Sequence, residues 1–483
     1  MIIKNRDELL SHGNIEGRRK VLDVLETGLV AGDPYDNMCK ILRIENGKLL
    51  IGSDEFPLGP MSAVRNPTHP RPFPPAPLVF DLDKIGNIYL VGGGKAAQRQ
   101  AQAIEDILGD LITDGHVNAK KGDKIVLKRV SVTLAGHPIP DEDSVSGARR
   151  IVEIERKAKK GDIVFMSESG GGTALMTLPA PGLTLKDVQD VNRILYFERG
   201  APMLVANAVR NLLTTLRLKH SRYVGDATLI MFSTDERPPG ASTPLQKPRG
   251  ITDEYDHAIY LLKEYGCWDE IPESVRQFLL RKDPAYYSLR QDEWYDKPHF
   301  RIRVVGPEYM LDAAEKKARE LGLNATIMVS SLKDLEASVV GETMANIARE
   351  IERHNRPLAA PCVFLLGGEL VVTTGKNPGL GGRNQEFVVG AASRIAGSRR
   401  IVIGSADSDG SDGPTDFAGG IVDGDTVRRA TEAGLDLTDE LRRHNTCGLL
   451  RRIGDTIDTG ILNTNVQDLR VIYVGPEESQ SSS

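Results

Sequence analysis

The stretch Ile88-Tyr-Leu-Val-Gly-Gly-Gly-Lys-Ala-Ala97 predicts a buried strand that turns directly into a helix. Its first four residues are apolar, and the residues after the glycines place apolar side chains on one helical face, at positions 97, 101, 104 and 108. Amide N–H groups at the start of a helix lack partners and lie at the positive end of the helix dipole, and glycine lets an anion approach them. We therefore expect four residues to bind an anion: Gly92, Gly93, Gly94 and Lys95. Taken alone, the motif is explained equally well as a tight structural turn followed by a solvated lysine.

The glycines match known phosphate-binding motifs only in part. In a P-loop the lysine follows a longer glycine-bounded loop, which this stretch lacks. The dinucleotide-binding fingerprint is met in its looser form by Gly92, Gly94 and Ala97. The motif alone therefore predicts an anion without identifying it.

Length and composition limit the classes of protein. A chain of 483 residues is expected to form about two to four domains. With a net charge of -6 and nearly balanced signs, nothing suggests a nucleic-acid partner, so local basic residues would have to hold an anionic substrate. The four cysteines form no C-x-x-C pair, which argues against structural zinc or a disulfide framework and favours the reducing cytoplasm. Neither a signal peptide nor a membrane span is predicted, so we expect a soluble protein without a membrane partner.

A second glycine-rich turn follows the next predicted buried strand, residues 162–166. It reads Ser167-Glu-Ser-Gly-Gly-Gly-Thr-Ala-Leu175. The hydroxyl groups and exposed amide groups of this turn can hold phosphate or carboxylate oxygens, although a tight structural turn is again the alternative. The candidate residues are Ser169, Gly170, Gly171, Gly172 and Thr173. Loops at the carboxyl ends of parallel strands converge on one crevice, so we expect the two turns to lie together.

Four further polar residues of the first half are candidates. His137, in the loop Gly136-His-Pro-Ile-Pro-Asp141, could bind substrate or shuttle a proton. Asn207 and Arg210 could reach an anion, and Asp235, after the predicted strand 227–233, could hold magnesium or orient a hydroxyl group. A turn shaped by prolines, a solvated arginine and a simple change of chain direction explain these residues equally well.

The second half repeats the strand–helix–strand order after a boundary near residue 300. A strand at 301–305, a helix at 311–321 and a strand at 325–329 predict a second, largely parallel sheet. Further on, Gly379-Leu-Gly-Gly-Arg-Asn-Gln-Glu386 opens a helix. Arg383 offers a rigid fork of donors suited to carboxylate or phosphate oxygens, and we place Asn384 and Glu386 in the same substrate-binding site.

The densest acidic segment is Asp407-Ser-Asp-Gly-Ser-Asp-Gly-Pro-Thr-Asp416. It is not an EF-hand loop, because Asp412 occupies the glycine position and Ala418 the position of the closing glutamate. Asp409 and Asp412 could bind Mg²⁺, or the segment is a series of Asp-Gly turns that happens to be acidic.

Five motifs together resemble the glycerate 2-kinases, whose C-terminal part is called the MOFRL domain. They lie at residues 92–97, 136–141, 169–175, 381–386 and 409–416, in the family's order. The resemblance implies two α/β domains: a Rossmann-like parallel-sheet domain at residues 1–299 and a smaller MOFRL-like α/β domain at residues 300–478. It also implies ATP-dependent phosphorylation of D-glycerate at the 2-hydroxyl, giving 2-phosphoglycerate, with Lys95 and Arg383 as the family's important lysine and arginine. Phosphoryl transfer depends on positioning and charge neutralisation, so a lysine, an arginine, backbone donors and Mg²⁺ form a sufficient set.

One segment departs from the family pattern. Family members usually carry Ser-Asp-Val-x-Gly-Asp after the strand that here ends at Ser233, and a lysine-glycine-glycine segment before it. This chain has Thr234-Asp-Glu-Arg237 and Leu218-Lys-His-Ser221 instead. Asp235 could replace the missing acid, but another sugar-acid substrate, or a non-catalytic sensor of a sugar acid or nucleotide, stays open.

A hydroxypyruvate reductase is the remaining alternative. It would need a nicotinamide site, but the strand expected after the first helix ends in Leu134-Ala-Gly136, without the acid that would hold the ribose. Under every alternative the partner is a small molecule, and a homo-oligomer stays open.

Overall fold

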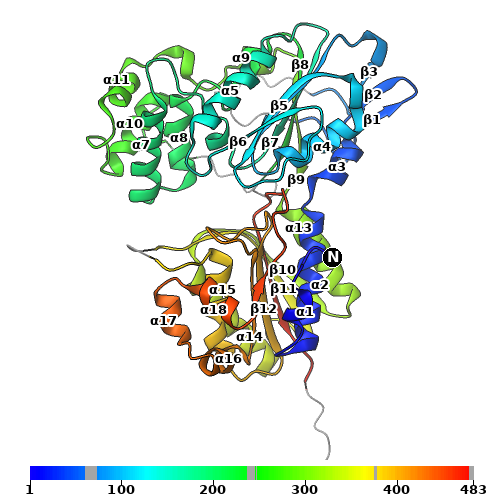
Figure 1. Ribbon diagram of the computed structural model, residues 1–483, viewed down its shortest axis with the longest axis vertical. Coiled ribbons are helices and arrows are strands. Elements are labelled where there is room, and N and C mark those ends of the chain that lie inside the picture. The colour runs from blue at the N-terminus through cyan, green and yellow to red at the C-terminus, as the bar shows by residue number, and fades with distance from the viewer. Residues whose placement is uncertain (60–72, 236–244, 246, 375–377, 478–483) are drawn as a thin grey trace, which may run out of the picture. The chain divides into compact units, whose positions relative to one another are not determined.

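The computed structural model describes residues 1–59, 73–235, 245, 247–374 and 378–477, which form two compact units. Of the described residues, 34–59, 73–234, 245 and 247–304 form the parallel-sheet unit, and 1–33, 235, 305–374 and 378–477 form the mixed-sheet unit. Each unit combines helices with a six-stranded sheet (Figure 1), so the predicted two-domain α/β class is confirmed.

The parallel-sheet unit has the strand order β6-β5-β4-β7-β8-β9. The strands are β4 (Ile88–Gly93), β5 (Ile112–Lys120), β6 (Ser131–Ala135), β7 (Ile163–Glu168), β8 (Thr228–Thr234) and β9 (His299–Val305). All neighbouring pairs from β6 to β8 are parallel. In chain order this is the 3-2-1-4-5-6 arrangement of a Rossmann fold, as predicted, and the point where the order reverses lies between β4 and β7.

Helices cover this sheet and build a second apolar layer beside it. The helix α4 (Ala97–Leu108) packs on β4, β5 and β7, and α5 (Glu142–Glu155) packs on β4, β5 and β6. A separate helical cluster comprises α7 (Leu185–Val191), the π-helix η3 (Asn192–Glu198), α8 (Met203–Leu213), α10 (Glu254–Glu264) and α11 (Glu273–Arg281). The short elements are α3 (Pro34–Ile41), β1 (Leu42–Glu45), β2 (Lys48–Ile51), β3 (Leu78–Asp81), α6 (Gly172–Leu175), α9 (Ser221–Val224) and α12 (Gln291–Trp294).

Three local predictions for this unit are wrong. The strand β5 is missing from the prediction because polar residues interrupt its apolar pattern; His116 and Asn118 are buried there because their side chains bond to each other, 3.1 Å from Nε2 to Oδ1. Residues 42–45 form a strand that pairs with β2, whereas the apolar pattern predicts helical structure from about residue 6 to residue 45. The strand expected to start the second sheet is β9, which lies beside β8 in the first sheet.

The mixed-sheet unit has the strand order β10-β11-β15-β12-β13-β14. The strands are β10 (Asn324–Glu336), β11 (Cys362–Val371), β12 (Ile401–Asp407), β13 (Gly419–Asp423), β14 (Thr456–Ile457) and β15 (Asp468–Val474). The expectation of a largely parallel sheet is wrong. The strands β10, β11 and β12 do run in one direction, as their helical crossovers require, but β15 inserts between β11 and β12 and pairs antiparallel with both.

Helices cover both faces of this mixed sheet. They are α2 (Ile15–Ala31) with α13 (Pro307–Glu320) on one face, and α14 (Ala337–His354) with α15 (Arg383–Ile395) on the other, together with α16 (Thr426–Glu432), α17 (Leu437–Arg442) and α18 (Thr446–Arg452). The apolar side of α2 is buried against the strands of this unit, so residues 1–33 pack here, whereas the expected N-terminal domain of residues 1–299 included them. An amphipathic stripe shows that a helix covers a sheet, but not which sheet.

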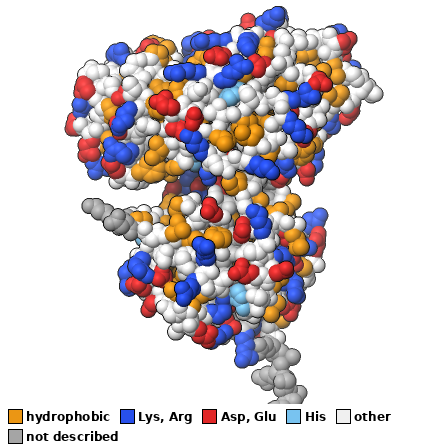
Figure 2. Space-filling view, in the orientation of Figure 1, with side chains coloured by type: hydrophobic (Ala, Val, Ile, Leu, Met, Phe, Trp, Pro, Cys, Tyr) orange, Lys and Arg blue, Asp and Glu red, His pale blue; other side chains and the backbone are white. Residues whose placement is uncertain are grey.

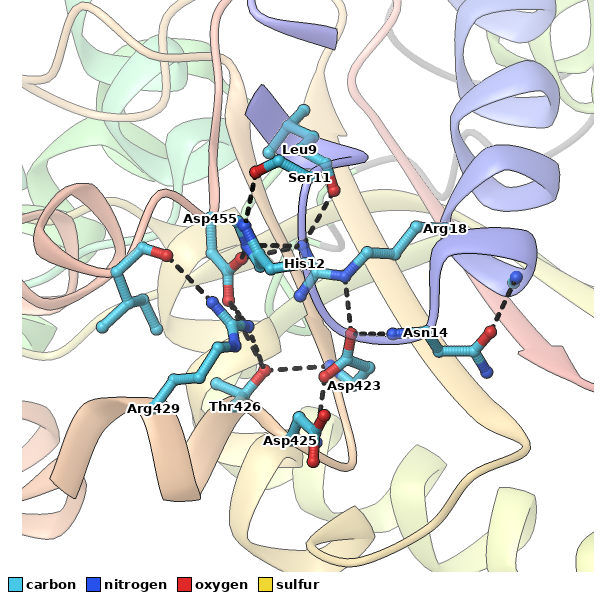
Figure 3. A network of polar contacts seen from close by, with 12 residues as sticks. Leu9, Ser11, His12, Asn14, Arg18, Asp423, Asp425, Thr426, Arg429 and Asp455 are labelled. Carbon is cyan, nitrogen blue, oxygen red and sulfur yellow. Dashed lines mark hydrogen bonds and ion pairs between the residues drawn. The ribbon is translucent and has the colours of Figure 1, made fainter. Parts of the chain in front are cut away.

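A buried ionic network holds the N-terminal segment in place (Figure 3). Arg18 on α2 is fully buried; its Nη1 donates to Asp455 Oδ1 at 2.8 Å and its Nε donates to Asp423. His12 and Arg429 also bond to Asp455, so three basic side chains surround one carboxylate. Burial would raise the pKa of Asp455, but these partners, Arg18 foremost, hold it at about 2. Removing one partner of such a buried network costs about 3–5 kcal/mol, which makes the network a strong attachment for the segment.

The surface carries both signs of charge. Figure 2 shows Lys and Arg side chains intermingled with Asp and Glu over the viewed face of each unit. Within the part of the chain that the structure describes, no helix combines the length and the apolar character needed to cross a membrane.

Candidate functional site

The two glycine turns meet at the carboxyl ends of β4 and β7, as expected. The amide of Lys95 donates to the carbonyl of Gly170 at 2.9 Å, and the amide of Ala96 donates to Ser169 Oγ at 2.8 Å. The hydroxyl of Ser169 is therefore engaged in a structural bond to the residue that precedes α4. Both turns lie at the point where the strand order reverses, which is where ligands bind in open α/β sheets.

The first turn contains glycines because the second turn packs closely against it. The Cβ atom of any other residue at position 94 would lie 2.2 Å from Ser169 Oγ, and Gly94 also has φ +147, a backbone conformation that residues with a side chain rarely adopt. At positions 92 and 93 a Cβ atom would come within 2.4 Å of Ser167 and Met176. These glycines thus serve close packing between the turns, and an anion would have to use other donors.

Such donors lie on the second turn. Among the described residues, the amide N–H groups of Gly170 and Gly171 donate no hydrogen bond. A Cβ atom at Gly171 would lie 3.1 Å from His137 Nε2 and 3.3 Å from Lys95 Cγ. Two basic side chains predicted from separate motifs are therefore brought together beside Gly171.

The other side of the turn carries a basic residue that the sequence analysis missed. Arg217 Nη1 pairs with Glu168, the last residue of β7, and its Nε donates to Thr173 Oγ1 at 3.3 Å. Both side chains of the pair are mostly buried, with 17% of Arg217 and 10% of Glu168 exposed. Arg217 belongs to no glycine motif, so its place at the turn follows only from the fold.

The helix α8 supplies two polar side chains that are only partly satisfied by the described residues. Arg210 is 6% exposed, and the Nη1 atom of its guanidinium lies 3.9 Å from Met203 Sδ; among the described residues it forms no ion pair. Burial, with a smaller contribution from the nearby Arg217, lowers the pKa of Arg210 to about 10, so the group is still protonated at neutral pH. The Oδ1 atom of Asn207 is buried without a hydrogen-bond partner in the described part of the chain. Because α8 packs beside α6, these groups belong to the same region as the second turn.

The arginine of the mixed-sheet unit has a very different environment. Arg383 Nε and Nη2 bond to Asp468 at 2.8 and 3.0 Å, Nη2 also bonds to Asp407 at 2.7 Å, and Nη1 lies 3.1 Å from Glu369. Burial would lower the pKa of Arg383, but the three carboxylates raise it well above its usual value. Its guanidinium is therefore already surrounded by acids, of which Glu369 is the most exposed at 40%.

The start of α15 is occupied by another carboxylate of the protein. Asp412 accepts from the amides of Asn384 and Gln385, at 3.0 and 2.8 Å, and burial raises its pKa to about 6. Asn384 also donates through Nδ2 to Asp412, at 3.2 Å. Glu386 is 2% exposed, and burial raises its pKa to about 7, opposed by His444, whose Nδ1 lies 3.2 Å away. The side chains of this predicted site are thus largely engaged with each other.

The residues expected to hold a metal do not form a ligand set. Asp412 uses both oxygens to cap α15, and Asp409 Oδ1 accepts from the amide and hydroxyl of Ser411, each at 2.9 Å. Asp235 follows β8, and its amide donates to Val305 at 3.0 Å, while the neighbouring Glu236 and Arg237 lie outside the described residues. Within residues 1–59, 73–235, 245, 247–374 and 378–477, no three His, Cys, Asp or Glu side chains are grouped to hold a metal ion.

Comparison with known proteins finds relatives along most of the chain. Residues 23–280 match a family model described as a domain of unknown function (DUF4147), and residues 362–468 match the MOFRL family. A "Glycerate 2-kinase" of Pyrococcus horikoshii is 31% identical over 467 residues, which is 94% of this chain and 98% of the relative. A "D-glycerate 2-kinase" of Thermotoga maritima is 33% identical and covers 81% of this chain and 90% of the relative. A "Putative hydroxypyruvate reductase" of Agrobacterium vitis is 32% identical, with coverages of 81% and 88%.

Solved structures agree with the sequence relatives. A crystal structure of a Pyrococcus horikoshii protein superposes with a TM-score of 0.68 at 31% identity, covering 95% of this chain and 99% of that one. A crystal structure of a glycerate kinase from Thermotoga maritima gives a TM-score of 0.71 at 27% identity, with coverages of 94% and 99%.

Proposed function

This chain belongs to the glycerate 2-kinase family, and from that premise we propose that it transfers the γ-phosphoryl group of ATP to the 2-hydroxyl of D-glycerate, giving 2-phosphoglycerate and ADP. The observation that carries the proposal is the meeting of Lys95, His137 and two open amide groups beside Gly171, at the switch point of a Rossmann sheet. Donors arranged in this way suit anionic groups, and glycerate and the phosphates of ATP are both anions.

Lys95 is the basic side chain proposed to act on the transferring phosphoryl group. Its amide is fixed by Gly170, which anchors the backbone of the residue beside the second turn. A cation held in place neutralises the charge that spreads over the phosphoryl oxygens in the transition state. His137, on the same side of Gly171, is proposed to bind the substrate.

Arg383 is proposed as a second stabiliser of the phosphoryl group. Asp407 and Asp468 fix the plane of its guanidinium, while the half-exposed Glu369 is the partner that a phosphoryl oxygen could replace. The proposal therefore requires Glu369 to leave Arg383 when the nucleotide binds.

Mg²⁺ is proposed to enter as part of the nucleotide substrate. This ion usually keeps one or two carboxylates together with substrate phosphates as ligands, rather than a closed protein cage. The described carboxylates form no such cage, so no step is assigned to an ion held by the protein alone. We propose that Asp235, which directly follows β8, replaces the acid of the family pattern and supplies a carboxylate to this ion.

The assay combines the purified full chain with D-glycerate, ATP and Mg²⁺ and measures ADP. Adding enolase then distinguishes the products, because enolase dehydrates 2-phosphoglycerate but not 3-phosphoglycerate. ADP release together with enolase-dependent product supports the proposal, and absence of ADP release across a panel of sugar acids would refute it.

A reductase is a second candidate because a relative carries that name. The strand that would present the ribose-binding acid of a nicotinamide enzyme is β5, not the strand that runs into Leu134-Ala-Gly136, which is β6. The acid after β5 is Asp123, whose Oδ2 already accepts from the amide of Lys120 at 3.1 Å. Incubation with hydroxypyruvate and NADH tests this alternative directly; oxidation of NADH would favour it over the kinase.

A further inference from the structure

We propose that Arg217 binds the carboxylate of the sugar-acid substrate and that Glu168 is the positioning residue that orients its guanidinium. The inference rests on the proposed kinase function and assigns the two sides of the second turn to different anionic groups. Lys95 and His137 lie beside Gly171, and Arg217 lies on the side of Gly172, where a Cβ atom would be 3.8 Å from its Nε.

The guanidinium of Arg217 is held in place by two of its nitrogen atoms, and the third can still donate hydrogen bonds. Glu168 holds Nη1 and Thr173 holds Nε, which fixes the plane of the fork. Among the described residues, Nη2 has no hydrogen-bond partner. This atom is not fully buried, so a ligand can reach it. An oriented donor that is still open suits a planar carboxylate, because arginine and carboxylate match in geometry.

Charge favours a carboxylate over a phosphate chain on this side. The Glu168 carboxylate offsets the charge of Arg217, so a ligand with several negative charges would be repelled at short range by Glu168. A carboxylate brings only one negative charge. Arg210 lies near enough to Arg217 for the two charges to lower the pKa of Arg210, and it has no acidic partner among the described residues. One substrate carboxylate would therefore compensate a local excess of positive charge.

The turn itself can complete the binding of the carboxylate. The amides of Gly170 and Gly171 donate no bond to another described residue, so they can donate to the ligand. Thr173 accepts from Arg217, which leaves its hydroxyl hydrogen for a further bond.

The experiment measures substrate binding and kinetics in Arg217→Ala and Arg217→Lys. Calorimetric titration of the full chain with D-glycerate, without nucleotide, is expected to show a dissociation constant raised ~10- to 100-fold in Arg217→Ala, the loss expected for hydrogen bonds to a charged group. In assays KM for D-glycerate should rise by a similar factor while KM for ATP changes less than ~3-fold. Arg217→Lys keeps the charge but not the fork and should give an intermediate value.

A double variant separates binding from simple repulsion. Removing Arg217 alone leaves the mostly buried Glu168 carboxylate uncompensated, and this charge could itself repel the substrate. In Glu168→Gln/Arg217→Gln that charge is absent. If the double variant still binds D-glycerate weakly, Arg217 contacts the carboxylate; recovery of wild-type affinity would overturn the inference, as would a rise confined to KM for ATP.

A control variant and the comparison of binding with ADP release separate the carboxylate site from the kinase activity. Arg193→Ala removes an exposed arginine–glutamate pair of the same unit and should leave both KM values unchanged. If the wild-type protein binds D-glycerate through Arg217 but releases no ADP, the kinase function fails and the carboxylate site stands.

Discussion

The two glycine turns that precede a basic residue, at Gly94-Lys95 and at Gly382-Arg383, look alike in sequence and have opposite electrostatic environments. At the first, the basic side chains of Lys95 and Arg217 both lie beside the neighbouring turn, residues 170–172, and Glu168 is the acid that contacts Arg217. At the second, three carboxylates contact the single guanidinium of Arg383, as described above. A glycine run followed by a cation therefore predicts the start of a helix, but not whether an anion from outside is needed.

The largest expected effect is the loss of stability in Arg383→Ala. This variant leaves Asp407 and Asp468, which are 3% and 0% exposed, without their main partner. We expect the free energy of unfolding to fall by about 3–5 kcal/mol, the cost of breaking a buried ion pair, and turnover to fall at least ~100-fold. Denaturant titration and the ADP assay measure the two effects.

An exposed arginine on the same helix provides the control for that variant. Arg394 on α15 pairs with Glu342, and more than half of its side chain is exposed, so Arg394→Ala should change stability by less than about 1 kcal/mol. Equal denaturation midpoints for Arg383→Ala and the wild type would show that the acids do not depend on Arg383.

The next largest effect is a loss of turnover in a variant of Lys95 that stays folded. Lys95→Ala is expected to lower kinase turnover at least ~100-fold, the scale of one lost electrostatic stabiliser, because Lys95 faces the proposed phosphoryl site. Stability should stay within about 1 kcal/mol of the wild type, in contrast to Arg383→Ala. Lys84→Ala, at an exposed pair with Asp81, serves as the control, and near-normal turnover of Lys95→Ala would remove Lys95 from the mechanism.

A pH-dependent effect should distinguish the acid-rich turn. Burial raises the pKa of Glu386 to about 7, so the folded state holds a proton that the unfolded state has already released. The stability from this proton is complete below about pH 4.5, the ordinary pKa of the group, and is lost as the pH rises through about 7, by about 3 kcal/mol. Glu386→Gln should remove this part of the slope when denaturant midpoints are compared from acid to weakly alkaline pH. An unchanged slope would contradict the assignment to Glu386.

The smallest expected effect tests the hydrogen bond of Ser169 that joins the two glycine turns. Ser169→Ala removes the hydroxyl that accepts from the amide of Ala96 and should cost about 1 kcal/mol of stability. Substrate affinity should change little if the hydroxyl forms only this structural bond. A large rise in KM for D-glycerate, with stability unchanged, would instead show that Ser169 contacts the substrate.

Periodicity and short motifs predicted much of the fold but not its distant pairings. The apolar runs located β4, β7 and β8, and the glycine turns located the starts of α4 and α6. The strand β5 escaped because its buried polar residues are stabilised by partners that the local pattern cannot show. The strand β15 inserts between β11 and β12 by pairing with residues up to about a hundred positions away in the chain. No local signal encodes such a pairing.

By itself, the sequence determined that this protein has two α/β domains, that glycine turns join strands to helices, and that five ordered motifs match one family. Only the tertiary structure decided that α2 packs on the C-terminal strands, that Arg217 stands at the second turn, and that Arg383 and the start of α15 are surrounded by the protein's own carboxylates. Local patterns record backbone preference and burial, whereas charge compensation depends on which distant side chains the folded chain brings within a few ångströms.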